Sequence, residues 1–192
     1  EEQRPECKWK ACVDSTPLLD KAWAEEAGIG WIGKNSNIIN SSKGSWMVIG
    51  HLLCTENLTP DKPAKSICGQ CNKCILSCPT KAITEPFVVD SRLCLSYHTI
   101  ENRKTNIPNE IINSIGSWVA GCDICQDVCP WNQKNIPSSN DPELEPKEWI
   151  LNLTKKQALE WTDEEWKEKL QGTALKRIKP WMWRRNAKAT KN

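Results

Sequence analysis

The apolar positions of residues 18–27 (LLDKAWAEEA) recur at the spacing of one helix face and predict a helix. Thr16 is the expected N-cap, because its hydroxyl can accept a hydrogen bond from the first turn, and Pro17 suits the first helical position. Gly28 is expected just past the C-terminal end, where a left-handed residue commonly closes a helix.

Residues 44–54 (GSWMVIGHLLC) are apolar and partly β-branched, which predicts a buried strand. The glycine-dense segment 28–33 only partly matches a nucleotide-binding fingerprint, because it follows a helix and leads into an extended segment at 36–40. We therefore expect its glycines to allow close approach of the backbone to some other ligand. His51, within the predicted strand, is expected to be a core histidine.

Short helices and strands are predicted in the rest of the chain. Residues 88–90 read as a strand and residues 109–119 as a helix. Further on, a threonine precedes Gln or Glu by three positions at Thr154 and at Thr162, which is the pattern of a capping box. We therefore expect two short helices, at about 155–161 and 163–170.

Composition narrows the class of protein. The net charge is +2, and no apolar run approaches the ~18 residues of a membrane span. The first residues lack the profile of an export signal, so we expect a cytoplasmic protein, and they lack an initiator Met, so we expect a fragment or a processed product. The 11 cysteines then favour metal or iron–sulfur binding over disulfides.

Four of the cysteines form the run C-x2-C-x2-C-x3-C-P over residues 68–79. This is the spacing of bacterial ferredoxins, in which three thiolates hold one [4Fe–4S] cluster and the fourth holds another cluster. A second set must therefore exist elsewhere in the chain.

The second set is C-x2-C-x3-C-P over residues 122–130, with Cys94, 16 residues after Cys78, supplying the missing thiolate. A zinc ribbon is the alternative, and the proline-terminated runs argue against it. Cys7, Cys12 and Cys54 fit no ligand spacing and are expected to be ordinary thiols. The predicted ligands are Cys68, Cys71, Cys74 and Cys129 for the first cluster, and Cys78, Cys94, Cys122 and Cys125 for the second.

Residues 172–192 carry seven Lys or Arg and no acid, which is compatible with a nucleic-acid contact or with a solvated terminal helix. In the contact interpretation, basic side chains would meet phosphates and Trp181 and Trp183 would stack on bases. In the alternative, the two tryptophans are core residues of a helix pair. The basic residues concerned are Lys176, Arg177, Lys179, Arg184 and Arg185.

Several segments together resemble the epoxyqueuosine reductases. They are 13–19 (VDSTPLL), 27–35 (AGIGWIGKN), 44–46 (GSW), 94–97 (CLSY), 99–101 (TIE), 121–126 (GCDICQ), 174–177 (ALKR) and 185–186 (RN). The likeness runs from about residue 12 to residue 186. Family members carry additional residues before the aspartate motif, so the resemblance also implies that this chain is a partial sequence.

The resemblance implies a reductase that uses cobalamin and two [4Fe–4S] clusters to convert epoxyqueuosine in tRNA to queuosine. It implies an α+β fold: a partial α/β cobalamin-binding domain in residues 1–60, a ferredoxin-like two-cluster module in 61–132, and a short α-helical, basic C-terminal region in 133–192. The expected partners are the anticodon stem-loop of tRNA as substrate and an electron donor such as ferredoxin or flavodoxin. The expected state is a monomer.

Asp14 matches the family's acidic position and is the candidate proton donor; by itself, it also reads as an acid near a helix N-terminus. The resemblance also implies a set of cobalamin contacts, most of them within the segments quoted above and one, Ile38, shortly after the second of these segments. They are Asp14, Lys34, Asn35, Ile38, Ser45, Ser96, Gly121, Cys122 and Asp123. Two other functions remain open: a two-cluster ferredoxin-type electron carrier, and a relative of the reductive dehalogenases acting on a small molecule.

Overall fold

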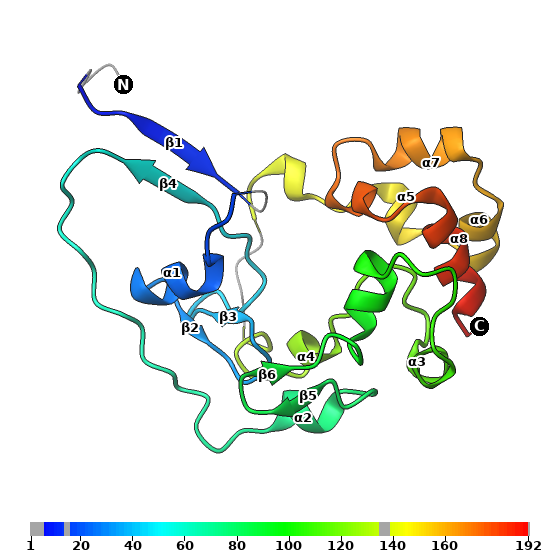
Figure 1. The fold of residues 1–192 in the computed structure, drawn as a ribbon, viewed down its shortest axis with the longest axis horizontal. Helices are drawn as coiled ribbons and strands as arrows, with labels where there is room; N and C mark the ends of the chain where they lie inside the picture. Colours follow the sequence, from blue (N-terminus) through cyan, green and yellow to red (C-terminus); the bar gives the residue numbers. More distant parts are fainter. Residues whose placement is uncertain (1–5, 14–15, 135–138, 192) are drawn as a thin grey trace.

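The computed structural model describes residues 6–13, 16–134 and 139–191 as a mixed α+β chain (Figure 1). Its described strands pair in three separate antiparallel ribbons of two strands each: β1 with β4, β2 with β3 and β5 with β6. The strands are β1 (Trp9–Cys12), β2 (Trp31–Ile32), β3 (Ile38–Ile39), β4 (His51–Cys54), β5 (Ile83–Glu85) and β6 (Val88–Val89).

Short helices fill most of the second half of the chain. The α-helices are α1 (Asp20–Glu26), α2 (Lys73–Ser77), α3 (Asn109–Ser114), α4 (Ile124–Asp127), α5 (Glu148–Leu151), α6 (Lys155–Glu160), α7 (Asp163–Leu170) and α8 (Pro180–Ala189). There is also a π-helix, η1 (Tyr97–Glu101), and two 3-10 helices, η2 (Pro142–Leu144) and η3 (Ala174–Arg177). No helix in the described ranges has the length and apolar character needed to pass through a membrane.

The β1–β4 ribbon differs from the buried strand predicted for residues 44–54. Only His51–Cys54 is a strand, and its Leu52 is 60% exposed. Among the described residues β4 pairs with β1 alone, and no second layer covers the ribbon, so the apolar pattern predicted burial wrongly. His51 is only partly a core residue: its Nε2 lies 2.7 Å from Asp20 Oδ1.

Helix α1 begins later than the pattern predicted. Its N-cap is Leu19 without a side-chain hydrogen bond, so the prediction of Thr16 as N-cap is wrong. The predicted position of Gly28 just past the end of the helix is confirmed, because Gly28 has φ +69° and the N–H of Ile29 donates to the carbonyl of Ala24. This is the Schellman arrangement that requires a left-handed residue at that position.

The glycines at 30 and 33 do approach a neighbour closely, but the neighbour is the chain itself. A Cβ on Gly30 would lie 2.4 Å from the carbonyl oxygen of Ile39, and one on Gly33 would meet the Ile39 side chain. The chain itself therefore accounts for glycine at both positions, and their approach to a ligand stays a prediction. They let β2 and β3 form a tight hairpin over buried Trp31 and Ile39.

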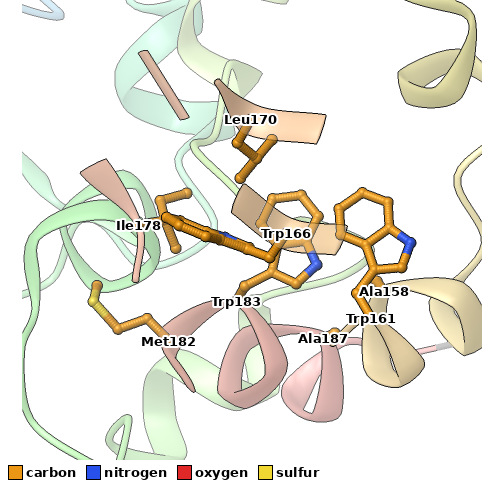
Figure 2. Close-up of a cluster of buried hydrophobic side chains, with 8 residues drawn as sticks. All are labelled: Ala158, Trp161, Trp166, Leu170, Ile178, Met182, Trp183 and Ala187. Atoms are coloured by element: carbon orange, nitrogen blue, oxygen red, sulfur yellow. The ribbon is translucent and has the colours of Figure 1, made fainter. Parts of the chain in front are cut away.

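The C-terminal helices enclose their own core around tryptophans (Figure 2). Both predicted capping boxes are present, with Thr154 accepting from the Gln157 N–H and Thr162 from the Glu165 N–H. Helix α8 packs against α6, α7 and η1, which places the end of the chain beside the cysteine-bearing middle segment (Figure 1).

The predicted helix over 109–119 is shorter than expected. It is α3, which ends at Ser114, and Gly116 with φ +56° follows it in a turn. The strand predicted at 88–90 is confirmed as β6.

Candidate metal centre and adjoining cavities

The first predicted group of cysteines lies around one small cavity. Cys68, Cys71, Cys74 and Cys129 all line it, and its volume is about 40 Å³. Three come from the loop and first turn around α2, and Cys129 comes from the residues after α4. Thiols nearly 60 residues apart in the sequence therefore share one site.

The second predicted group lines a separate, larger cavity of about 300 Å³. Its cysteines are Cys78, Cys94, Cys122 and Cys125. Helices α2 and α4 pack directly against each other, and the charge of Cys74 in the first group acts on Cys125 in the second. The two groups are therefore neighbours.

The thiols of each group also influence one another electrostatically. Burial raises the pKa of Cys74, and Cys129, Cys68 and Cys71 add to the rise. Burial likewise raises the pKa of Cys122, with Cys94 and Cys78 among its other causes. The same grouping therefore follows from electrostatics and from the cavity linings.

Cys125 has a strongly raised pKa. Burial, followed by the nearby Cys122, Cys74 and Cys94, raises the pKa of this thiol to about 12. Without a positive partner, the group is protonated at neutral pH. Because iron binds the thiolate, cluster assembly here must release protons.

One side-chain N–H and one backbone N–H point at the sulfur atoms of predicted cluster ligands. The indole Nε1 of Trp31 donates to Cys68 Sγ at 3.4 Å, and the N–H of Ala82 donates to Cys78 Sγ at 3.2 Å. Such bonds stabilise negative charge on cluster sulfurs. Sequence reasoning missed both residues, because neither type signals a donor to sulfur.

The donor sets fit two four-iron clusters chemically. Each cavity is lined by four cysteines, the number of thiolates that a [4Fe–4S] cluster takes. Within the described ranges, no three His, Cys, Asp or Glu side chains are arranged to hold a single metal ion.

A second, outer cavity of about 480 Å³ adjoins the cavity of the second cysteine group. The two share Lys21, Asn37 and Gln126 in their linings. Trp46 and Val48 at the outer cavity are 45% and 86% exposed. An open, largely apolar surface with polar groups at its inner end fits one face of a large amphipathic cofactor.

The structure divides the residues predicted to contact cobalamin among several places. Asn35, Ser96, Cys122 and Asp123 line the cavity of the second group, while Ile38 and Ser45 line the outer cavity. Lys34 and Gly121 line neither of these cavities.

Lys34 lies instead on the side of the first cysteine group. Its Nζ donates to the carbonyl of Gly69 at 2.8 Å and to Asn72 Oδ1 at 2.9 Å. It thereby fixes the loop between Cys68 and the start of α2. The contact of Lys34 with cobalamin stays a prediction; in the structure its Nζ is engaged by the loop of the first cysteine group.

Sequence reasoning missed the polar network at the inner end of the outer cavity. Ser45 Oγ donates to Gln126 Oε1 at 2.8 Å, and Asn132 Nδ2 donates to Ser45 Oγ at 2.8 Å. Gln126 Nε2 donates in turn to Asp123 Oδ1 at 2.7 Å. These residues join the segment at Ser45 to the residues around α4.

Asp14 lies outside the described residues. Its neighbour Val13 lines a further cavity of about 440 Å³ together with Asp20 and Lys21. Lys21 also lines the two cavities described above, so the three are contiguous at this side chain.

The tail contains both core and surface residues. Trp183 is buried and stacks on Trp161, with ring centroids 5.3 Å apart, whereas Trp181 is 39% exposed. Trp181 lines a cavity of about 850 Å³ with Arg184 and Lys188. The core interpretation therefore holds for Trp183, and a basic, partly aromatic groove remains at Trp181.

Comparison with known proteins identifies the central segment first. Residues 67–132 match the family of 4Fe-4S double cluster binding domains. Over 98% of its length the chain is 65% identical to an epoxyqueuosine reductase of Synechococcus sp. (strain CC9605), and over 97% it is 67% identical to one of Prochlorococcus marinus (strain NATL2A). The resemblance to epoxyqueuosine reductases is confirmed.

Solved epoxyqueuosine reductases have the same fold over this region. One, crystallised with an epoxyqueuosine-modified tRNA-Tyr stem loop, matches with a TM-score of 0.91 at 33% identity. Another, from Bacillus subtilis, matches with a TM-score of 0.90 at 32% identity. Both matches cover 98% of this chain and 49% of the solved chain. The chain spans about 60% of the length of the two cyanobacterial relatives.

Proposed function

We propose that this chain is the two-cluster and helical part of a cobalamin-dependent iron–sulfur reductase that converts epoxyqueuosine in tRNA to queuosine. The observation that carries the proposal is the pair of adjacent cysteine groups beside a cavity, in a chain 65% identical to an epoxyqueuosine reductase. The relatives are longer than this chain, and the proposal is that the whole reductase needs their additional residues as well.

We assign the cluster ligands across the two runs. The first cluster takes Cys68, Cys71, Cys74 and Cys129, and the second takes Cys78, Cys94, Cys122 and Cys125. The shared cavity linings and the mutual electrostatic influence of the thiols support this assignment.

The reaction requires two electrons and two protons for each epoxide, because the oxygen leaves as water and a double bond remains. Amino-acid side chains supply no low-potential electrons, so the chemistry needs cofactors. Two adjacent clusters can pass single electrons inward from an external donor, for which a ferredoxin or flavodoxin is suitable. The second group, at the larger cavity, is then the delivery end.

Cobalamin, when bound, would supply a cobalt nucleophile that attacks the epoxide. The residues available to hold it are those at the joined cavities: Asn35, Ile38, Ser45, Ser96, Cys122 and Asp123. The hydrogen-bonded network of Ser45, Gln126 and Asn132 keeps this wall rigid.

We assign the proton donor to Asp14. An opening epoxide develops negative charge on oxygen, and a carboxylic acid whose pKa is raised toward neutrality by burial can protonate it. The Bacillus subtilis relative has been described with an aspartate catalytic loop swung out of its active site, which supports a movable acid in this family.

The anticodon stem-loop of tRNA is the proposed substrate, since a relative has been crystallised with a modified stem loop. The groove at Trp181 offers Lys188 for a phosphate and an exposed ring for a base, whereas Arg184 in the same groove is already paired with Asp163 at 2.7 Å. Arg185 is less available, because its guanidinium is hydrogen-bonded to backbone carbonyls.

Anaerobic reconstitution with iron and sulfide, followed by addition of cobalamin, tests the proposal. The full-length protein that contains this chain, loaded in the same way and supplied with a reductant, is expected to bind an epoxyqueuosine-containing stem loop and convert it to the queuosine form, seen by mass spectrometry as loss of one oxygen. A haloarene is the comparison substrate. Cluster-loaded protein that ignores cobalamin would indicate a plain electron carrier, and preference for the haloarene would indicate a dehalogenase.

A further inference from the structure

Asn186 of α8 is a fully buried polar residue with a complete set of hydrogen bonds. Its Nδ2 donates to the carbonyl of Thr99 at 2.7 Å and to the carbonyl of Val119 at 2.8 Å. Its Oδ1 accepts from the guanidinium of Arg185 at 2.8 Å. The amide thus connects the C-terminal helix to two separate segments of the middle of the chain.

Those two segments carry ligands of the second cysteine group. Thr99 lies in η1, which starts three residues after Cys94, and Val119 precedes Cys122 by three residues. Thr99 also links the segments directly, because its Oγ1 accepts from the N–H of Gly121 at 3.0 Å. Its side chain is completely buried.

Arg185 binds the same π-helix on both sides of Thr99. Its guanidinium donates to the carbonyl of His98 at 2.8 Å and to that of Asn102 at 2.8 Å. These are carbonyls at the C-terminal end of η1, where a positive charge is favourable. Single π-helical turns are rare and are found frequently at functional sites.

We propose that Asn186 is a positioning residue for the second cluster, acting through Thr99 to hold the segments of Cys94 and Cys122 in register. The proposal rests on the ligand assignment given above. The first group has no equivalent link in the described residues: Trp31, the loop at Cys68 and the residues after α4 build its wall. Loss of the Asn186 amide should therefore affect one cluster and spare the other.

The informative variant is Asn186→Asp. It keeps the size of the side chain and can still accept from Arg185, but its carboxylate cannot donate to the two carbonyls. Two buried acceptors then lose their donor and face a negative charge, which separates the two segments. Thr99→Val keeps the backbone carbonyl that Asn186 binds and removes the second link between the two segments, from Thr99 Oγ1 to the N–H of Gly121, without altering α8.

Leu170→Ala is the matched control. Leu170 is completely buried in the helical core with α8, and its truncation loosens that core without removing a hydrogen bond to the segments of Cys94 and Cys122. Ile178→Val in the same core is a milder second control. A general loosening of the C-terminal region would appear in these variants as well.

Each reconstituted protein is assayed for iron and sulfide and, after reduction, by electron paramagnetic resonance. In the wild type, two neighbouring reduced clusters should give a spin-coupled spectrum. Asn186→Asp and Thr99→Val are expected to lose roughly half of their iron and to show the uncoupled signal of one cluster, while both controls keep the full content.

Full iron content and a coupled spectrum in both Asn186→Asp and Thr99→Val would overturn the proposal. Equal loss in Leu170→Ala and Ile178→Val would overturn it too, since the effect would then be general destabilisation. A wild-type chain that holds only one cluster would instead refute the ligand assignment, so the two failures are distinguishable.

Discussion

The indole of Trp31 is the single side chain that donates from a ring to a predicted cluster ligand, Cys68, in the described chain. Hydrogen bonds to cluster sulfur stabilise the reduced, more negative state and raise the reduction potential. Trp31→Phe keeps the ring and removes the donor. We expect the potential of the first cluster to fall by tens of millivolts, where about 59 mV is a tenfold change for one electron.

A redox titration followed by electron paramagnetic resonance measures this shift. Trp131→Phe is the control, because Trp131 packs edge-on against Trp31 with ring centroids 5.1 Å apart and, among the described residues, makes no hydrogen bond to sulfur. An equal shift in both variants would show that ring packing, rather than the N–H donor, sets the potential.

The proposed role of Asp14 as proton donor can be tested by a single substitution. Asp14→Asn removes the acidic proton while keeping the size of the side chain. Turnover of epoxyqueuosine in cobalamin-loaded protein should fall by about 10²–10⁴-fold, the usual contribution of a general acid. Cobalamin binding, followed by its visible spectrum, should be retained; normal turnover would remove Asp14 from the mechanism.

The role of a residue could be predicted where the chemistry of the site accepts only one residue type. The eight cysteines could be grouped from spacing alone, because the proline-terminated run requires a ligand from elsewhere. Lys34 could not be placed, since a lysine in a turn has many possible partners and its contact with Gly69 depends on the fold. Asn186 was part of the family resemblance, but its hydrogen bonds to Thr99 and Val119 depend on long-range packing.

At the scale of the element, the capping box of α7 makes a quantitative prediction. Thr162 accepts from the Glu165 N–H at 3.1 Å, and the Glu165 carboxylate accepts from the Thr162 N–H at 2.8 Å. Thr162→Ala should lower the free energy of unfolding by about 1 kcal/mol. Denaturant titration measures it. Thr162→Ser keeps the hydroxyl and should stay near wild type; equal losses in the two would exclude the cap as the cause.

Elements fixed by residues within one helical turn were predicted well, and elements that depend on packing against distant segments were not. The capping boxes at Thr154 and Thr162 need only residues within one helical turn, so the helices follow from the sequence. The start of α1 and the exposure of β4 depend on what packs against them. The apolar pattern alone cannot distinguish a strand whose two faces are buried from β4, which lies in a two-stranded ribbon with exposed leucines.

At the scale of the whole molecule, the C-terminal helices and the two-cluster segment form one structure. Residues Ile100, Val119 and Ala120 pack against the helical core, and α8 packs on η1. The groove at Trp181 is consequently built on the same helix that carries Asn186. The segments that the sequence pattern divides at residue 133 therefore share hydrogen bonds and apolar contacts.

The crossed ligation of the clusters is also a property of the whole molecule, and it can be tested by substitution. If each run held its own cluster, Cys78→Ser would damage the cluster that Cys71→Ser damages. In the crossed arrangement, Cys78→Ser should instead match Cys122→Ser, and Cys129→Ser should match Cys71→Ser. Serine keeps the size of the side chain but is a poor ligand for iron.

Geometry favours the crossed outcome. Cys129 packs in a core cluster with Trp31 and Ile39, against which Cys68 also lies, whereas Cys78 accepts from the Ala82 N–H and lines the other cavity. Each variant should lose about half of the iron, and the remaining cluster, identified by its spectrum and potential, reveals which site was lost. Pairing of the Cys78→Ser spectrum with that of Cys71→Ser would refute the crossed assignment. Because the intact chain brings Cys129 back beside Cys68, we expect neither half of the cysteine segment alone to retain a complete cluster.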